Sequence, residues 1–310
     1  NVSRYPLFCA VDADSVLQRD SLQRVAKPFL EDSSVIACGG SIRIANGCKI
    51  SGGFLEKIGL PKSFLARVQI VEYLRAFLFG RMGWSPINAM LIISGAFGIF
   101  KKDAVADAGG YRTDTIGEDM ELVVRLHRLY RLAGKPYRIV FVPDPICWTE
   151  APENLKTLRT QRTRWQRGLA ESLSMNIGLL FHPKGGTVGW LAFPFMVVFE
   201  WLGPLLEVTG YLFMFLLFYF DMISGYAFGA FLFVAVGFGL LLSMSALLLE
   251  EMSFHIYPRA SHLFWLMVAA LVENFGYRQL TSVWRLTGLL SWLFFRKGSW
   301  GVMKRNTTSK

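Results

Sequence analysis

The sequence predicts an α/β domain followed by a membrane-associated helical region. Hydrophobic residues make up 53% of the 310 residues and charged residues only 18%, which excludes intrinsic disorder, a state that needs low hydrophobicity and high charge. Residues 1–187 contain 25 of the 33 Lys and Arg residues, whereas Gly185 to Pro258 contains none. We therefore expect one region built for water at 1–187 and one built for lipid at 188–310.

The first part of the chain alternates predicted strands with predicted helices. The apolar run Leu7–Val11 indicates a buried strand, and residues 21–31 suggest a short helix. Val35–Ala37 predicts a strand that ends at a Gly39-Gly40 turn, and the alternation at Ile42 and Ile44 predicts another. This order is typical of an α/β domain with a largely parallel sheet.

The alternation continues to residue 175. The wide apolar stripe of Ala66–Arg81 predicts an amphipathic helix, packed in the core or lying on a membrane surface. Met90–Phe100 indicates a strand interrupted by a functional turn at Ser94-Gly95. Further elements are expected as a helix over 118–132, a strand over 139–142 ended by Pro143 and Pro145, and a basic helix over 153–175.

The rest of the chain has the composition of membrane segments. Trp190–Phe220 and Tyr226–Leu249 are each long enough to cross a bilayer, which needs about 20 apolar residues. Glu200 and Glu207 are expected to face protein rather than lipid. The segment 262–295 carries charged residues, so we expect an interfacial or re-entrant element rather than one simple span.

The four cysteines suggest no chemistry. Cys9, Cys38, Cys48 and Cys147 show neither a CxxC pair nor a cluster with His, so we expect small buried thiols rather than a zinc site. The net charge of +10 by itself would suit a nucleic-acid partner. Basic residues alternate with acids beside the membrane segments, however, so contact with lipid headgroups explains the charge better.

Two acidic motifs are candidates for chemistry. Asp12 and Asp14 directly follow the first strand, at the carboxyl end of a strand, where ligands bind in open α/β sheets. Two carboxylates there can converge on a hard divalent cation, which takes oxygen ligands from the protein and from substrate phosphates. Glu118-Asp119 opens a predicted helix, where a deprotonated Asp can act as a general base. Each motif alone has a structural alternative, an acidic turn for the first and a helix cap for the second.

A third motif lies on the basic helix. Gln161, Arg164 and Trp165 are spaced i, i+3, i+4 and therefore share one face, which could bind a pyrophosphate and a sugar ring. The alternative is a basic helix that lies against anionic headgroups. For Arg162 and Arg167 we favour that alternative.

Together the three motifs resemble one family closely. Asp-x-Asp, then Glu-Asp about a hundred residues later, then Gln-x-x-Arg-Trp before membrane segments, is similar to the processive, membrane-embedded inverting glycosyltransferases of family 2. These include cellulose, chitin, hyaluronan and poly-N-acetylglucosamine synthases. The resemblance covers essentially the whole chain and extends to three further stretches, Ile93–Phe97, Gly109-Gly110-Tyr111 and the terminal Trp300-Gly301-x-Met303-x-Arg305.

The resemblance implies a fold and a role for each motif. It implies a partial GT-A (Rossmann-like) domain over 1–187 and a helical transmembrane region over 188–310. Asp12 and Asp14 would bind the diphosphate of a nucleotide sugar and its Mg2+ or Mn2+. Asp119 would be the base, supported by Glu118. The acceptor loop would contain Ser94 and Gly95, and Gln161, Arg164 and Trp165 would hold the pyrophosphate and the acceptor.

The implied reaction transfers a sugar, from a UDP-hexose or UDP-N-acetylhexosamine, to a growing membrane-associated polysaccharide. The alternative is transfer of a single sugar to a lipid carrier or glycolipid. A transporter would explain the spans but gives no reason for the acidic and Arg/Trp motifs. Two departures from the family are that its first strands would precede Asn1, and that Gly117 stands where Thr is commoner.

The charge distribution also predicts a location. Basic residues after the last apolar segment are retained on the cytoplasmic side of a membrane. We therefore expect a multi-pass protein of the inner membrane with its catalytic domain and C-terminus in the cytoplasm. The residues that carry this expectation are Arg296, Lys297, Lys304, Arg305 and Lys310.

Overall fold

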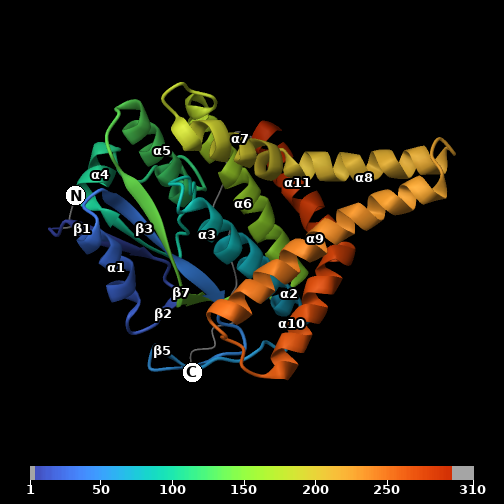
Figure 1. The fold of residues 1–310 in the computed structure, drawn as a ribbon, viewed down its shortest axis with the longest axis horizontal. Coiled ribbons are helices and arrows are strands. Elements are labelled where there is room, and N and C mark those ends of the chain that lie inside the picture. Colours follow the sequence, from blue (N-terminus) through green and yellow to red (C-terminus); the bar gives the residue numbers. More distant parts are fainter. Residues whose placement is uncertain (1–3, 295–310) are drawn as a thin grey trace.

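A mixed five-stranded sheet forms the centre of the first domain (Figure 1). The computed structural model describes residues 4–294. The strands are β1 (Leu7–Val11), β2 (Val16–Leu17), β3 (Val35–Ile44), β6 (Phe97–Lys101) and β7 (Arg138–Thr149), in the order β1-β6-β3-β7-β2.

The expectation of a largely parallel sheet is wrong. Among the strands of residues 4–294, only β3 and β7 pair in parallel. β6 is antiparallel to both of its neighbours, β1 and β3, and β2 is antiparallel to β7. The alternation of strands and helices along the sequence does not determine strand direction. The irregular segment before β6 brings that strand into the sheet from the opposite end, between β1 and β3.

Two predicted strand boundaries are also wrong. β3 runs straight through Gly39-Gly40, where a Cβ at Gly40 would lie 2.7 Å from the Phe97 ring. These glycines therefore allow close packing and form no turn. β7 likewise runs through its two prolines, because its pairing with β3 shifts register at Ser41 and Pro145, where a ladder hydrogen bond is not required.

Helices cover the sheet and place the acidic motif. α1 (Ser21–Glu31), α5 (Glu118–Leu132) and α6 (Leu155–Met175) match the predicted helices, and α4 (Lys102–Asp107) follows β6. The short strands β4 (Lys49–Ser51) and β5 (Phe54–Lys57) form a hairpin around Gly52 and Gly53. The core contains Trp148, Phe97 and Ile139, all fully buried.

The predicted amphipathic helix is packed in the core. It is a continuous helical segment made of α2 (Phe64–Tyr73), the π-helical turn η1 (Leu74–Phe79) and α3 (Gly80–Trp84). Val71, Leu74 and Leu78 on it are almost completely buried. Of the two placements predicted for this helix, the structure supports the core.

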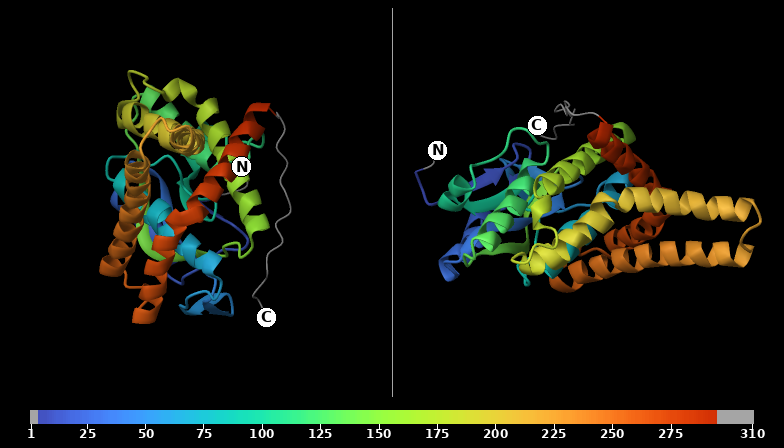
Figure 2. Two further views of the ribbon diagram at one scale, coloured as in Figure 1. Left: turned by 90° about the vertical axis from the view of Figure 1, so that its right-hand side faces the viewer. Right: turned by 90° about the horizontal axis from the view of Figure 1, so that it is seen from above.

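Two long apolar helices project side by side away from the sheet domain (Figures 1 and 2). α9 (Gly225–Ser253) is long and apolar enough to cross a membrane. The other predicted span is bent by 48°, where the helical segment Val188–Trp201 meets α8 (Gly203–Tyr219). Val188–Trp201 consists of η3 (Val188–Ala192), α7 (Phe193–Phe195) and η4 (Met196–Trp201), and it follows η2 (Ile177–Leu179).

The last described segment is broken, as expected. α10 (Ala260–Val272) and α11 (Arg278–Phe294) flank the π-helical turn η5 (Glu273–Tyr277), in which Gly276 has a φ of 98°. With 13 residues, α10 is too short to cross a bilayer alone. The five basic residues predicted to set the topology, and the terminal Trp300–Arg305 motif, lie outside the described residues.

The acids of the apolar segments face protein, which confirms another prediction. Glu207 pairs with Arg278 at 3.1 Å and accepts a hydrogen bond from Ser282, both on α11. Glu200 pairs with Arg285 of the same helix at 2.8 Å. α11 therefore supplies the cations for both acids and connects this region to α6, where Gln166 accepts a hydrogen bond from Arg285.

Candidate active site

Two of the predicted acids converge on Gly95. Asp12 follows β1, Asp119 lies in the first turn of α5, and Gly95 is in the turn that enters β6. The Gly95 N–H donates to Oδ2 of Asp119 at 3.0 Å. A Cβ placed on Gly95 would lie 3.7 Å from that same oxygen and 3.7 Å from Oδ1 of Asp12. The structure therefore brings together residues more than a hundred positions apart, at the edge of the sheet where β1 ends.

Asp119 does not behave as a simple helix cap. The N-cap position is Gly117, and Asp119 is the second residue of α5. Its Oδ1 accepts from the N–H of Met120 at 2.7 Å, while its Oδ2 leaves the helix for Gly95. Burial raises the pKa of this carboxyl above its usual value, and the two backbone hydrogen bonds and the nearby Arg81 oppose that rise. A carboxylate in this setting holds a proton more readily than an exposed one.

Glu118 shares the same electrostatic environment. Burial raises the pKa of its carboxyl, and the negative charges of Asp119 and Asp12 raise it further. Arg164 of α6 lowers it, which shows that this predicted arginine lies near the acidic motif. The structure thus places a cation beside a cluster of three acids, an arrangement typical of functional sites.

Arg81 is a site residue that the sequence analysis missed. It lies on α3, is only 3% exposed, and stacks over the Phe77 ring with its guanidinium carbon 4.6 Å from the ring centroid. Burial lowers its pKa to about 10, and the charge of Asp119 opposes that change. In the sequence, Arg81 lies off the apolar stripe of its predicted helix. That position by itself predicts only an exposed side chain and no role in a site.

Tyr111 is a second residue whose place only the structure shows. Its ring packs edge-on against Phe100 of β6, and its hydroxyl pKa is raised by burial and by the charges of Asp119 and Glu118. The turn before it, Gly109-Gly110, has positive φ at both residues. The stretch containing Tyr111 resembled family members in sequence, but no role followed from that resemblance.

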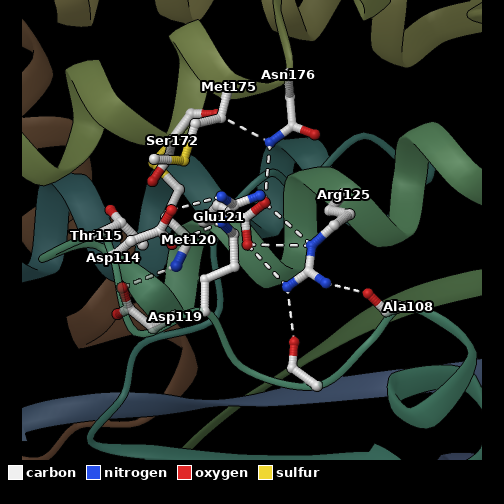
Figure 3. A network of polar contacts seen from close by, with 12 residues as sticks. Ala108, Asp114, Thr115, Asp119, Met120, Glu121, Arg125, Ser172, Met175 and Asn176 are labelled. Carbon is white, nitrogen blue, oxygen red and sulfur yellow. Dashed lines mark hydrogen bonds and ion pairs between the residues drawn. The ribbon is translucent and has the colours of Figure 1, made fainter.

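Arg125 holds this turn in place (Figure 3). Its guanidinium donates to the carbonyls of Ala108 and Gly110 and pairs with Glu121 one helical turn earlier, at 2.8 Å. Asn176, just after α6, donates to the same Glu121 carboxylate at 3.3 Å. The buried pair therefore connects the loop containing Tyr111 to α5, and α5 to the end of α6.

The three residues predicted to share one face of α6 have different surroundings. Gln161 is buried, and its Oε1 accepts from Arg162 at 2.9 Å. Arg164 lies near Glu118, as its effect on that carboxyl shows. Trp165 is 37% exposed and packs against the rings of Tyr73 and Phe77. Arg164 thus lies near the acidic motif and Trp165 is partly exposed, whereas Gln161 faces the interior.

The proposed headgroup contact of Arg162 and Arg167 is wrong. Both side chains are buried, with 2% and 7% of their surfaces exposed. Arg162 pairs with Glu72 of α2 at 2.6 Å and also lies over the Trp165 ring, 4.5 Å from its centroid. Arg167 pairs with Glu171 at 2.9 Å. A buried arginine requires such a partner, because an unpaired charge in the interior is costly.

The oxygen donors at the end of β1 suit a hard divalent cation. Asp12 and Asp14 lie in one turn, closed by a hydrogen bond from the Ser15 N–H to the Asp12 carbonyl at 3.0 Å. Within residues 4–294, no three or more His, Cys, Asp or Glu side chains are grouped to hold a metal. A cation at this turn would thus need further oxygen ligands from a bound diphosphate, as Mg2+ commonly does.

The cysteine expectation holds for two of the four residues. Cys38 and Cys147 are buried, Cys48 is half-buried, and Cys9 is exposed. Cys9 lies on β1, one of the two edge strands of the described sheet, which has a strand neighbour on one side only.

Comparison with known proteins identifies the family. Residues 7–295 match the family described as glycosyl transferase family group 2. The chain is 34% identical over 171 residues to a poly-beta-1,6-N-acetyl-D-glucosamine synthase of Staphylococcus aureus (strain COL), which spans 54% of this chain and 36% of that protein. The corresponding synthase of Staphylococcus epidermidis is 30% identical over 169 residues, with the same coverage. The chain thus matches little more than a third of the length of these relatives.

One solved structure supports the fold. A mannosyltransferase from Pyrobaculum calidifontis, in complex with GDP-Man and Mn2+, superposes with a TM-score of 0.52 at 15% identity, covering 94% of this chain and 63% of that one. The predicted GT-A-like fold is therefore confirmed, together with the family resemblance of the motifs. The chain belongs to glycosyl transferase family group 2.

Proposed function

We propose that this protein transfers a sugar from a nucleotide sugar to a growing polysaccharide at a membrane, with inversion at the anomeric carbon. The observation that carries the proposal is the convergence of Asp12 and Asp119 on Gly95, in a chain of this family. The related staphylococcal proteins are poly-beta-1,6-N-acetyl-D-glucosamine synthases, which favours a UDP-N-acetylhexosamine or UDP-hexose donor.

Asp119 is the general base in this proposal. Its carboxylate accepts the proton of an acceptor hydroxyl, whose oxygen then forms the new bond to the anomeric carbon. The bond from that carbon to the diphosphate breaks on the opposite face, and the diphosphate leaves with the electron pair. The raised pKa makes Asp119 a stronger base than an exposed aspartate, provided that the pH keeps it deprotonated.

The other motif residues bind the two substrates. Asp12 and Asp14 would hold Mg2+ or Mn2+, which supplies positive charge to the leaving diphosphate; the mannosyltransferase with the similar fold was solved with Mn2+. Arg164 provides a further cation for the diphosphate. The half-open indole of Trp165 offers a flat apolar face to the acceptor sugar. Gln161 supports this group from the interior, because it accepts a hydrogen bond from Arg162, whose guanidinium lies over the indole. Ser94 and Gly95 form the acceptor loop, and Glu118 supports the base.

The helices that leave the domain support the assignment to a membrane. α9 and the bent pair containing α8 carry large apolar side chains on their surfaces, such as Phe213 and Phe233, which are 60% and 80% exposed. We assign 1–187 as the cytoplasmic catalytic domain and 188–310 as the region embedded in or lying on the inner membrane. The acceptor is a polysaccharide or glycolipid, and no nucleic acid takes part.

Membranes from cells that express the protein test this function directly. They are incubated with a panel of UDP- and GDP-sugars, and the products are separated by size. We expect polymer from one donor, and a fall of about a hundredfold or more in Asp119→Asn, because Asn does not accept the proton. The control is Asp103→Asn, an exposed aspartate of α4. A single-sugar lipid product would instead support non-processive transfer, and normal turnover by Asp119→Asn would refute the base.

A further inference from the structure

The bend Thr115–Gly117, directly before the acidic motif, lies against the backbone of α6. A Cβ on Gly117 would lie only 2.7 Å from the carbonyl oxygen of Gly168, and a Cβ on Gly168 would lie 3.0 Å from the Cα of Gly117, so the two backbones are in close contact. Ser172, one turn further along α6, donates to the Gly117 carbonyl at 3.0 Å. Figure 3 shows Thr115 and Asp119 on the turn that enters α5, with Ser172 nearby. The position of this bend determines where α5 begins.

Glu171 of α6 is the main polar contact of the bend. Its Oε2 accepts from the Thr115 hydroxyl at 2.9 Å and from the Ile116 N–H at 2.9 Å. Its Oε1 accepts from Nε of Arg167 at 2.9 Å. The Thr115 oxygen in turn accepts from the Gly117 N–H at 3.1 Å. Every group around the carboxylate is a donor, so only an acceptor-only side chain satisfies all three.

Arg167 extends this network to the last described helix. Its Nη1 donates to the Ser291 hydroxyl of α11 at 3.2 Å. α11 lies close to α6 beside this contact, because a Cβ on Gly288 would be 2.5 Å from the Thr163 carbonyl oxygen. A continuous set of hydrogen bonds therefore runs from α11 through Arg167 and Glu171 to the bend.

We propose that Glu171 and Thr115 are positioning residues for Asp119, and that Arg167 connects them to α11. The contacts fix the position of the bend relative to α6. The first turn of α5 is thereby held where Oδ2 of Asp119 accepts the hydrogen bond from the Gly95 N–H. Neither Glu171 nor Thr115 is among the residues to which the proposed function assigns substrate binding. The proposal rests on the proposed function, because it assigns the network to the base of that reaction. A displacement of about 1 Å at a reacting group can cost about a hundredfold in rate, so the bend has a measurable effect on turnover.

Thr115 offers the sharpest test, because Val has its shape without its hydroxyl and Ser keeps the hydroxyl. In Thr115→Val we expect kcat to fall about tenfold while the Kd for UDP, the probe of the donor site, stays within about twofold. Thr115→Ser should recover most of the lost turnover. The control is Thr160→Val, an exposed α6 residue whose hydroxyl donates to the Lys156 carbonyl of its own helix.

The pH dependence of kcat distinguishes a loss of positioning at Asp119 from a general loss of packing. The hydrogen bond from Gly95 lowers the pKa of Asp119, so losing it moves the acid limb of kcat to higher pH in Thr115→Val. Equal kcat in Thr115→Val and Thr115→Ser, or an unmoved acid limb, would overturn the proposal. A parallel loss of UDP binding and thermal stability would also overturn it, because that pattern indicates only packing. The Asp119→Asn variant distinguishes a failure of the positioning proposal from a failure of the proposed function. If Asp119 is the base, kcat of this variant falls by about a hundredfold or more, whatever the Thr115 variants show.

Discussion

Buried charges are arranged differently along α6 and around the acidic motif at the start of α5. Near the middle of α6 and on the side facing α2 and α11, each buried arginine has its own acid, as in Arg162–Glu72 and Arg167–Glu171. At the acidic motif, burial and the charges of Asp119 and Asp12 raise the pKa of the Glu118 carboxyl, and burial and the charge of Asp12 raise the pKa of Asp119. Arg164 opposes the rise at Glu118, and Arg81 opposes the rise at Asp119. Matched pairs stabilise a structure only modestly, whereas neighbouring acids cost stability and are retained where they do chemistry.

The two arrangements of charge also differ in how clearly the sequence shows them. The acids of the site stand out in the sequence because they follow a strand or open a helix. The matched pairs do not stand out, because one partner often lies far along the chain. The following predictions test whether clustered acids and matched pairs really differ in this way.

Metal removal should have the largest effect. With EDTA, we expect sugar transfer to fall to background and to return when Mg2+ or Mn2+ is added, because Asp12 and Asp14 would share the cation with the diphosphate. The loss should leave the midpoint of thermal unfolding nearly unchanged. Asp14→Asn should weaken donor binding as well as turnover. Full activity in EDTA would show that the acids at the end of β1 hold no metal.

Breaking a matched pair should instead affect stability. Arg162→Met removes the ion-pair partner of Glu72 and leaves the more weakly acting Arg75 near it, so the free energy of unfolding should fall by about 3 kcal/mol. In the double variant Glu72→Gln, Arg162→Met, much of this loss should be recovered, because no unpaired charge remains. Thermal unfolding of the detergent-solubilised protein measures both. If the double variant were as unstable as the single one, the ion pair would not be the cause.

Filling the space between the acids should reduce activity without unfolding the protein. A Cβ in Gly95→Ala meets Asp12 and Asp119 at ordinary contact distances, 3.7 Å, so the fold can accommodate it. It would nevertheless occupy the space in which the carboxylates face each other, and we expect turnover to fall about tenfold. Gly83→Ala is the matched control, because a Cβ there meets nothing within 4 Å. A tenfold loss of turnover in both variants would show that the space at Gly95 between the two carboxylates is not specifically required.

The pH dependence should show the smallest but most specific effect. Asp119 must be deprotonated to act, and burial raises its pKa, so turnover should fall with decreasing pH at a higher pH than an exposed aspartate would give. An acid with a raised pKa in the folded state loses stability as the pH rises through that pKa. Stability and activity should therefore change in opposite directions across this range. Measuring kcat and the unfolding midpoint at the same pH values tests this, and parallel changes would contradict it.

Local patterns predicted much of the fold but missed long-range detail. Strand β1 and helices α1 and α5 match their predicted bounds closely, because each depends on apolar periodicity and on nearby end signals. The continuity of β3 through Gly39-Gly40 was missed, because it depends on Phe97 and Ile146 packing against Gly40. The Arg167–Glu171 pair could have been found, since it has the i, i+4 spacing of a helical ion pair.

By itself, the sequence determined the resemblance to the family, the position of each acidic motif at the end of a strand or the start of a helix, and the division between a charged and an apolar region. Those properties depend on residue type and short spacing. Only the tertiary structure decided the direction of β6, the meeting of Asp12 and Asp119 at Gly95, and the pairing of Arg162 with Glu72, 90 positions away. The physical reason is that burial and partners set the state of a charge, and both come from parts of the chain that no local pattern connects.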